Sequence, residues 1–236
     1  MTDVSALWDF DDPAGSELRF RTAAETAEGP DRLVLLTQVA RALGLQERYD
    51  EGHAVLDGLA VTHDEVAVRA SLERGRLLRS AGDPDAARPH LESAALAARE
   101  SGLDALHVDA LHMVALVAPP EDQQRLHEEA LAVARGSSDQ AARDWDASLL
   151  NNLGMVHADA GDWAAALAAF EEALAARERI GDAGRTRVAR WMVGWALRNL
   201  GRTDEARVVQ SALKAELDAA GEEDPYVDEE LALLQG

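Results

Sequence analysis

Apolar residues recur along much of the chain at intervals of three and four positions, the spacing of one face of an α-helix. The clearest pair of such stripes lies within residues 149–156 and 167–174. Gly161 separates the two stripes, and glycine commonly ends helices because it adopts a left-handed conformation without strain. The next residue, Asp162, is suited to cap a second helix. We therefore expect two helices joined by a tight turn.

The same arrangement repeats. A glycine, a second glycine seven positions later and an alanine five positions beyond that occur together three times. The three sets are Gly75, Gly82 and Ala87; Gly154, Gly161 and Ala166; and Gly194, Gly201 and Ala206. Poorer copies begin at Ala40 and Leu111, so five copies start 35, 36, 43 and 40 residues apart. A period of this length predicts a chain of stacked helical hairpins.

The first glycine of each set lies inside a predicted helix, where glycine costs about 1 kcal/mol relative to alanine. A cost that recurs at one position of a repeat needs a common cause. Close approach of two helices is that cause, and we expect each internal glycine to face the alanine of its partner helix. For Gly154 that alanine is Ala166.

This pattern resembles the tetratricopeptide (TPR) repeat, whose signature is a Leu-Gly pair, then an alanine, an aromatic residue and another alanine. The match is best at Leu153-Gly154, Gly161-Asp162-Trp163, Ala166, Phe170 and Ala173-Leu174. It departs from the signature where His157 replaces an aromatic residue and Arg74 replaces a leucine. The resemblance implies an all-α, right-handed α-solenoid of about five TPR-like hairpins.

Extra helices are predicted at both ends of the array. Asp12-Pro13 opens one over about residues 13–28, and Asp224-Pro225 opens another, because proline is tolerated at the first helical position. We expect three parts: an acidic N-terminal segment and capping helix at 1–30, the repeat array at 31–220, and a C-terminal capping helix at 221–236.

Composition narrows the class of partner. The 236 residues carry a formal net charge of −21, which argues against nucleic-acid binding because that depends on clustered basic residues. The chain has no cysteine and no stretch of roughly 18 apolar residues, and the pattern of its first residues does not predict a secretory leader. We therefore expect a cytoplasmic protein with no membrane contact.

No catalytic signature is present: the sequence has no Gly-x-Ser-x-Gly, no Walker loop, no dinucleotide fingerprint and no His-Glu-x-x-His. Its seven histidines do not pair at metal-ligand spacing. His112 lies three residues from Asp109, which allows a weak carboxylate–imidazole pair. No catalytic residue, metal or cofactor is predicted.

In TPR proteins the first helix of each hairpin faces a concave groove, and the resemblance assigns groove residues here. They are Arg41, Arg69, Arg76, His112, Asn151, Asn152, Trp191, Trp195 and Arg198. Arginine forks suit carboxylates and paired amides suit an extended peptide backbone. The groove residues thus predict an acidic peptide or partner segment as ligand.

Three points stay open in the sequence. Arginines also fill the solvated side of any soluble solenoid, so the groove assignment has a plain structural alternative. Trp191 and Trp195 either form an aromatic wall for a ligand or pack beneath the C-terminal helix. The acidic, aromatic segment Trp8-Asp9-Phe10-Asp11-Asp12 either occupies the arginine groove itself or packs its rings onto the first helices.

The function predicted is a non-catalytic scaffold that binds a protein or peptide partner. An alternative is a peptide-responsive regulatory sensor, because TPR arrays resembling this one occur in bacterial regulators. With no effector region in the sequence, such a sensor would act on a separate chain. An enzyme is the weakest interpretation, since it rests only on Asp109, His112 and His157. The sequence names neither the partner nor the oligomeric state.

Overall fold

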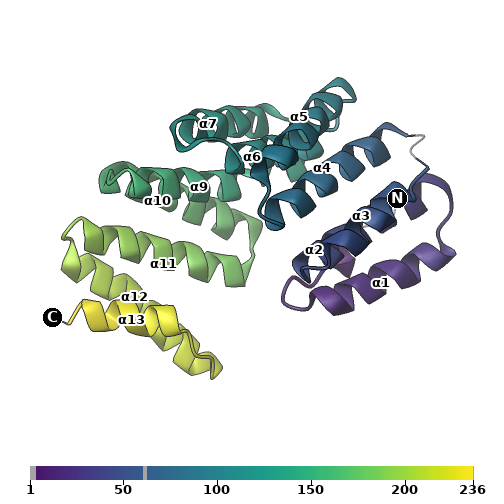
Figure 1. Ribbon diagram of the computed structural model, residues 1–236. Coiled ribbons are helices and arrows are strands. Elements are labelled where there is room, and N and C mark those ends of the chain that lie inside the picture. The colour runs from purple at the N-terminus through teal and green to yellow at the C-terminus, as the bar shows by residue number, and fades with distance from the viewer. Residues whose placement is uncertain (1–3, 61–62, 236) are drawn as a thin grey trace. The chain divides into compact units, whose positions relative to one another are not determined.

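The computed structural model describes residues 4–60 and 63–235 (Figure 1), and every regular element within these ranges is a helix. The chain divides into two compact units, Met1–Asp122 and Gln123–Gly236, and each is described by itself. The first unit holds η1 (Ser5–Leu7), α1 (Pro13–Thr26), α2 (Gly29–Leu45), α3 (Tyr49–Asp57), α4 (Asp64–Ser80), α5 (Pro84–Glu100) and α6 (Asp104–Leu116). After α7 (Pro120–Gly136), which begins at the end of the first unit, come α8 (Gln140–Arg143), α9 (Asp146–Asp159), α10 (Trp163–Ile180), α11 (Ala183–Asn199), α12 (Thr203–Ala220) and α13 (Pro225–Leu233).

Helices that follow each other in sequence pack together in both units, as Figure 1 shows. In the first unit α1 packs on α2, α2 on α3 and α4, α4 on α5, and α5 on α6. In the second unit α9 packs on α10, α10 on α11, α11 on α12, and α12 on α13. This succession of helical hairpins is the architecture of a TPR α-solenoid, so the predicted fold class is confirmed.

The turns use the predicted residues. Gly161 ends α9 with a φ of +77°, and the Asp162 carboxylate accepts a hydrogen bond from the Ala165 amide at 3.0 Å. Gly82 and Asp83 do the same between α4 and α5, where the glycine φ is +89°. Positive φ is the conformation that glycine adopts without a steric penalty, so these glycines stop one helix and the aspartates start the next.

The internal glycines lie at close helix crossings, as predicted, but the residue they face differs. A Cβ atom added to Gly154 would lie 2.5 Å from Phe170 Cδ1, and one added to Gly75 would lie 2.5 Å from Leu91 Cγ. At Gly75 the predicted alanine is also close, since the Ala87 carbonyl oxygen would lie 3.4 Å from the added atom, but it is not the nearest neighbour. The space is filled by the large side chain one helical turn further along the partner helix, because a long side chain leans across the crossing while alanine does not.

One repeat position forms the core throughout. It lies sixteen residues after each copy begins, and its side chains are at most 3% exposed: Leu56, Leu91, His127, Phe170 and Gln210. The same position thus accepts aliphatic, aromatic and polar residues. In the third copy α7 begins at Pro120, at the predicted turn, which places His127 in the core.

Candidate functional site

The candidate groove residues fall into two groups, one in each unit. Arg41, Arg69, Arg76 and His112 lie in the first unit, on α2, α4 and α6. The remaining five lie in the second unit, on α9 and α11: Asn151, Asn152, Trp191, Trp195 and Arg198.

Two of the predicted arginines, Arg41 and Arg76, line a cavity of about 170 Å³ in the first unit. We call it the arginine pocket. Its lining comes from three helices and consists of Arg41, Gly44, Leu45, Glu73, Arg76, Leu77, Arg79, Ser80 and Met113. Buried Leu77 and Met113 give it an apolar part. Its volume is below the roughly 300–1,000 Å³ of sites that enclose a small molecule, so it suits one side chain of a longer ligand.

The spacing of the lining residues along α2 and α4 explains why their side chains face the same pocket. Arg41 and Leu45 are four residues apart on α2, and Glu73 and Arg76 are three apart on α4, so each pair shares a helix face. Gly44 lets α2 and α4 approach closely, because a Cβ atom there would lie 2.8 Å from Leu77 Cδ2. Short spacing and a small residue together bring the two helix faces into one pocket.

Arg76 is ion-paired within the protein. It pairs with Glu73 on its own helix and with Asp109 on α6, and its side chain is 14% exposed. Both carboxylates are buried, so these charges stabilise one another away from water. The Asp109 carboxylate thus has Arg76 as a partner, whereas the sequence suggested a pairing with His112.

Arg41 and Arg79 differ from Arg76, because neither makes an ion pair with a residue in the ranges 4–60 and 63–235, although the nearby Glu73 and Asp109 carboxylates attract Arg41. The Arg41 guanidinium lies over two aromatic rings, 5.4 Å from the centroid of Trp8 and 5.5 Å from that of Phe10. Burial, with repulsion from Arg76, lowers the pKa of Arg41 below its ordinary value. An arginine remains charged at neutral pH even so. The pocket therefore contains two guanidinium groups that can bind an anion.

Glu73 adds a buried carboxylate to the same pocket. Its side chain is 2% exposed, and its Oε2 atom has no hydrogen-bond partner among the described residues. Its negative charge is balanced by its ion pair with Arg76 and by the nearby Arg41.

The other two candidates of the first unit lie outside the pocket lining. Arg69 is ion-paired with Glu65 at 2.9 Å, one helical turn away on α4. His112 is half-buried on α6. The charge of Arg69 still influences the pocket, because it contributes to lowering the pKa of Arg41.

In the second unit the two predicted tryptophans belong to a packed aromatic cluster. The rings of Trp191 and Trp195 stack with centroids 6.0 Å apart, and Trp195 meets Trp163 edge-on at 4.8 Å. Trp191 also contacts the ring of Tyr226 and packs beside Val227, both on α13. Of the two roles open in the sequence, the structure shows packing beneath the C-terminal helix.

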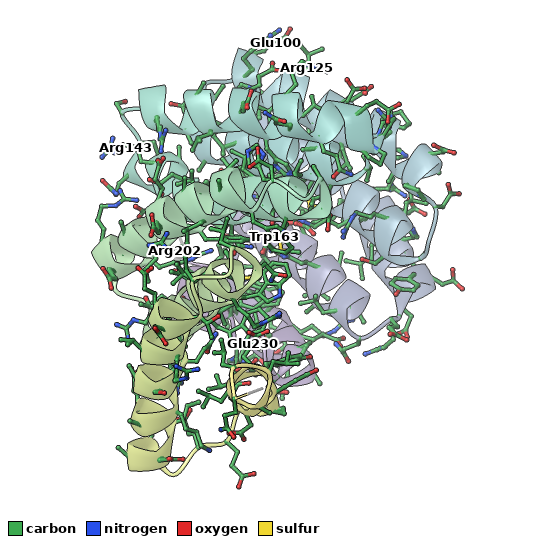
Figure 2. All side chains as sticks on the ribbon, turned by 90° about the vertical axis from the view of Figure 1, so that its left-hand side faces the viewer. Glu100, Arg125, Arg143, Trp163, Arg202 and Glu230 are labelled. Atoms are coloured by element: carbon green, nitrogen blue, oxygen red, sulfur yellow. The ribbon has the colours of Figure 1, made fainter. Side chains whose placement is uncertain are left out.

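Arg198 also contacts α13. Its guanidinium donates two hydrogen bonds to the Glu230 carboxylate, at 2.7 and 2.8 Å, and the Glu230 side chain is 5% exposed. Figure 2 labels Glu230 on α13, which is seen there end-on. The ion pair of Arg198 thus helps to hold α13 in place.

The last two candidates, Asn151 and Asn152, are half-buried neighbours on α9.

Sequence reasoning missed three features of the pocket. The buried carboxylate of Glu73 was not singled out, although its i,i+3 spacing from Arg76 is the signal for an ion pair. Leu45 and Met113 were not considered because they read as ordinary helical apolar residues. The stacking of Arg41 on the N-terminal rings had no signal in local spacing, since 33 residues separate Trp8 from Arg41.

The acidic, aromatic N-terminal segment was left with two possible roles. Trp8 packs edge-on against Phe20 of α1, and its indole donates a hydrogen bond to Gln38 of α2 at 3.1 Å. No residue of this segment lines the arginine pocket. The rings therefore pack onto the first helices. They contact Arg41, which is itself part of the pocket lining.

In the part of the chain that the structure describes, no three His, Asp or Glu side chains gather as a metal site would require. No helix within the same ranges has the length and apolar character needed to cross a lipid bilayer.

Comparison with known families supports the architecture. Tetratricopeptide repeat models match residues 145–209 and residues 68–93. Together with the helical hairpins and their glycine crossings, these matches show that the chain is a TPR repeat protein. No catalytic family was found, and no curated protein sequence matches the chain.

Several solved structures share the fold. BtubC from P. vanneervenii has a TM-score of 0.62 at 17% identity, and the match covers 95% of each chain. The TPR-sensor protein PH0952 from Pyrococcus horikoshii, a signal transduction ATPase with numerous domains, has a TM-score of 0.73 at 12% identity, over 94% of this chain and 36% of that one. The quorum sensor NprR from B. thuringiensis in its apo form has a TM-score of 0.66 at 17% identity, and the match covers 99% of this chain and 64% of that one. The structure of NprR in complex with its cognate peptide NprX has a TM-score of 0.57 at 15% identity, and the match covers 99% of this chain and 66% of that one. At these identities the likeness establishes the fold.

Proposed function

We propose that this protein is a non-catalytic binding module that holds an acidic segment of a peptide or partner protein in the arginine pocket. TPR repeats typically mediate binding to proteins and peptides. The observation that carries the finer proposal is the pair of guanidiniums, Arg41 and Arg79, that line one cavity and make no ion pair with a residue in the described ranges, so their N–H groups are not taken up by a carboxylate.

The remaining lining defines the ligand more closely. A carboxylate of the ligand would meet Arg41 and Arg79, since guanidinium forks bind carboxylates with paired hydrogen bonds. An apolar side chain of the same segment would cover Leu45, whose side chain is 50% exposed. An acidic peptide offers both groups, whereas a simple inorganic anion offers only the first.

The net charge of −21 affects how the proposal is tested. An acidic peptide is repelled by the protein as a whole, so attraction has to come from charges within a few ångströms. At about 0.15 M salt the screening length is about 8 Å, which suppresses the long-range repulsion and leaves the local contacts. Binding should therefore be measured near that ionic strength.

The test uses an unlabelled tetraglutamate peptide, acetylated and amidated so that it has no terminal charges, with tetraglutamine as the neutral probe. Isothermal titration calorimetry should show binding of the tetraglutamate, and the variants Arg41→Gln and Arg79→Gln should each weaken it at least about fivefold, as loss of a charge-assisted hydrogen bond implies.

Arg32→Gln is the matched control, because it makes the same change in charge on an exposed part of α2 outside the pocket. It should leave binding unchanged. Equal losses in Arg32→Gln and Arg41→Gln, or equal affinity for tetraglutamate and tetraglutamine, would refute the proposal.

A second candidate function is a peptide-responsive sensor that acts on a separate effector chain. The similarity to NprR, a quorum sensor whose structure is known with its peptide NprX, favours it. The two candidates share the pocket and differ in the response to ligand. A change in small-angle scattering when the peptide binds would favour the sensor, and an unchanged profile would favour a scaffold.

A further inference from the structure

The N-terminal segment carries an aromatic pair that the proposed function does not use. The rings of Trp8 and Phe10 are parallel, with an interplanar angle of 1° and centroids 4.8 Å apart. Trp8 in turn meets Phe20 edge-on at 4.9 Å, and Phe20 is completely buried in α1. The pair is thus supported by the core of the first unit.

The backbone of this segment is fixed as well. The Ser16 hydroxyl donates to the Asp9 carbonyl and accepts from the Asp9 amide, both at 2.8 Å. Arg19 Nε donates to the Leu7 carbonyl at 2.9 Å. Ser16 is fully buried. These bonds hold both rings in place relative to α1, and the Trp8–Gln38 bond holds them relative to α2.

Arg41 lies over this aromatic pair at nearly equal distances from the two rings, 5.4 and 5.5 Å. A guanidinium held by ring contacts does not use its N–H groups for them, so these groups remain available to an anion. The neighbouring arginines are held differently, since Arg69 pairs with Glu65 and Arg76 pairs with Glu73. The cation–π contacts therefore order Arg41 without using its hydrogen-bonding capacity.

We propose that Trp8 and Phe10 are positioning residues of the arginine pocket: their rings hold the Arg41 guanidinium in place for an anionic ligand. This inference rests on the proposed function for the identity of the ligand. It also explains why an acidic, aromatic segment lies beside the pocket without lining it.

Phe10 is the residue to change, because its side chain is 46% exposed and its loss should leave the fold intact. In the tetraglutamate assay Phe10→Leu should weaken binding about 3- to 10-fold, the range expected when a cation–π contact is lost. The conservative variant Phe10→Tyr keeps the ring and should retain wild-type affinity. Leu18→Ala, which truncates a 67% exposed side chain on α1, is the control for a surface apolar change.

A double variant separates positioning from general stability. If the ring acts through Arg41, Phe10→Leu should have no further effect on affinity in the Arg41→Gln background. An equal loss with and without Arg41, or no loss in the wild-type background, would overturn the inference.

A readout without ligand keeps this inference distinct from the proposed function. The ring currents of Trp8 and Phe10 should displace the Nε–Hε resonance of Arg41 from its ordinary position in NMR spectra of the wild type and of Phe10→Tyr, and the resonance should return towards that position in Phe10→Leu. A wild-type protein that does not bind tetraglutamate would refute the proposed function, and this resonance would still decide the positioning role. An Arg41 signal that is unshifted in the wild type, or unaffected by Phe10→Leu, would overturn it.

Discussion

Gly154 on α9 lies against the ring of Phe170 on α10, so closely that a Cβ atom on the glycine would be 2.5 Å from Phe170 Cδ1 and 2.8 Å from Cζ. The same relationship links Gly75 to Leu91, and Gly194 to Gln210, whose Nε2 would lie 2.5 Å from the added atom. In each hairpin the large side chain occupies the volume that a side chain on the first helix would need. The repeated glycine is therefore a packing requirement of the hairpin.

Replacing Gly154 with leucine should destabilise the second unit by about 3 kcal/mol, the upper part of the range for inserting volume into a packed core. The Phe170 side chain is completely buried, so it cannot move aside into solvent to make room for the leucine. Urea unfolding followed by circular dichroism would measure the loss. The control is Gly136→Leu, because a Cβ atom at Gly136 meets nothing within 4 Å. Similar stabilities for the two variants would show that the crossing tolerates a side chain.

Replacing Arg76 with methionine should destabilise the protein by about 3–5 kcal/mol, because it leaves buried carboxylates without a counter-charge. Glu73 is 2% and Asp109 6% exposed. Adding Glu73→Gln and Asp109→Asn to the variant should recover part of the loss in urea unfolding. For comparison, Arg69→Met breaks a more exposed pair with Glu65 and should cost less than about 1 kcal/mol. Equal costs for the two arginines would contradict the distinction between them.

The bond between Arg198 and Glu230 should decide how firmly α13 is held. Arg198→Met would leave the Glu230 carboxylate buried and unpaired, so amide hydrogen exchange in Pro225–Leu233 should accelerate at least about tenfold, as for loss of a charged hydrogen bond. Lys214→Met is the matched control: it removes an exposed pair with Asp228 on the same helix and should have a small effect. If both variants exchange alike, burial of the pair is not what anchors the helix.

His127 should make stability depend on pH below neutrality. Burial lowers the pKa of its imidazole to about 4, whereas the unfolded chain has an ordinary value near 6.5. Between these two values the unfolded state binds a proton that the folded state does not, so the free energy of unfolding falls as the pH decreases from about 6.5 to about 4.

The measurement is urea unfolding of the wild type and of His127→Gln at several pH values. Comparing the two series removes the contribution of the carboxylates. The free energy of unfolding of the wild type should then fall relative to that of His127→Gln as the pH decreases through this window. A difference that does not change with pH would mean that the histidine titrates normally in the folded protein.

The sequence was enough to predict the hairpins because each depends on local chemistry. Gly161 can adopt a positive φ, and Asp162 can cap a helix, whatever surrounds them. The partner of Gly154 was predicted less well, since spacing alone indicates a close crossing but not which side chain leans into it. Phe170 rather than Ala166 fills the gap because of its length and direction, which are properties of the packed structure.

The pocket was predictable only in part. The helical face that carries Arg41 and Arg76 follows from the repeat, and both line the cavity. Which arginine is already ion-paired does not follow, because the partner of Arg76 on α6 is 33 residues away and that of Arg198 on α13 is 32 residues away. Both intervals are close to one repeat, so carboxylates about one period downstream are the signal to look for in such chains.

The tryptophans are unevenly divided, since Trp8 is the one in the first unit and Trp145, Trp163, Trp191 and Trp195 belong to the second. Indole emission from the first unit thus comes from a single residue next to a cation, while that from the second includes three rings close enough to exchange excitation energy. Without Trp8, indole emission would come from the second unit alone, and the difference between the wild type and Trp8→Phe would report on the first unit. Melting of the two units could thus be compared in the intact protein, without attaching any dye.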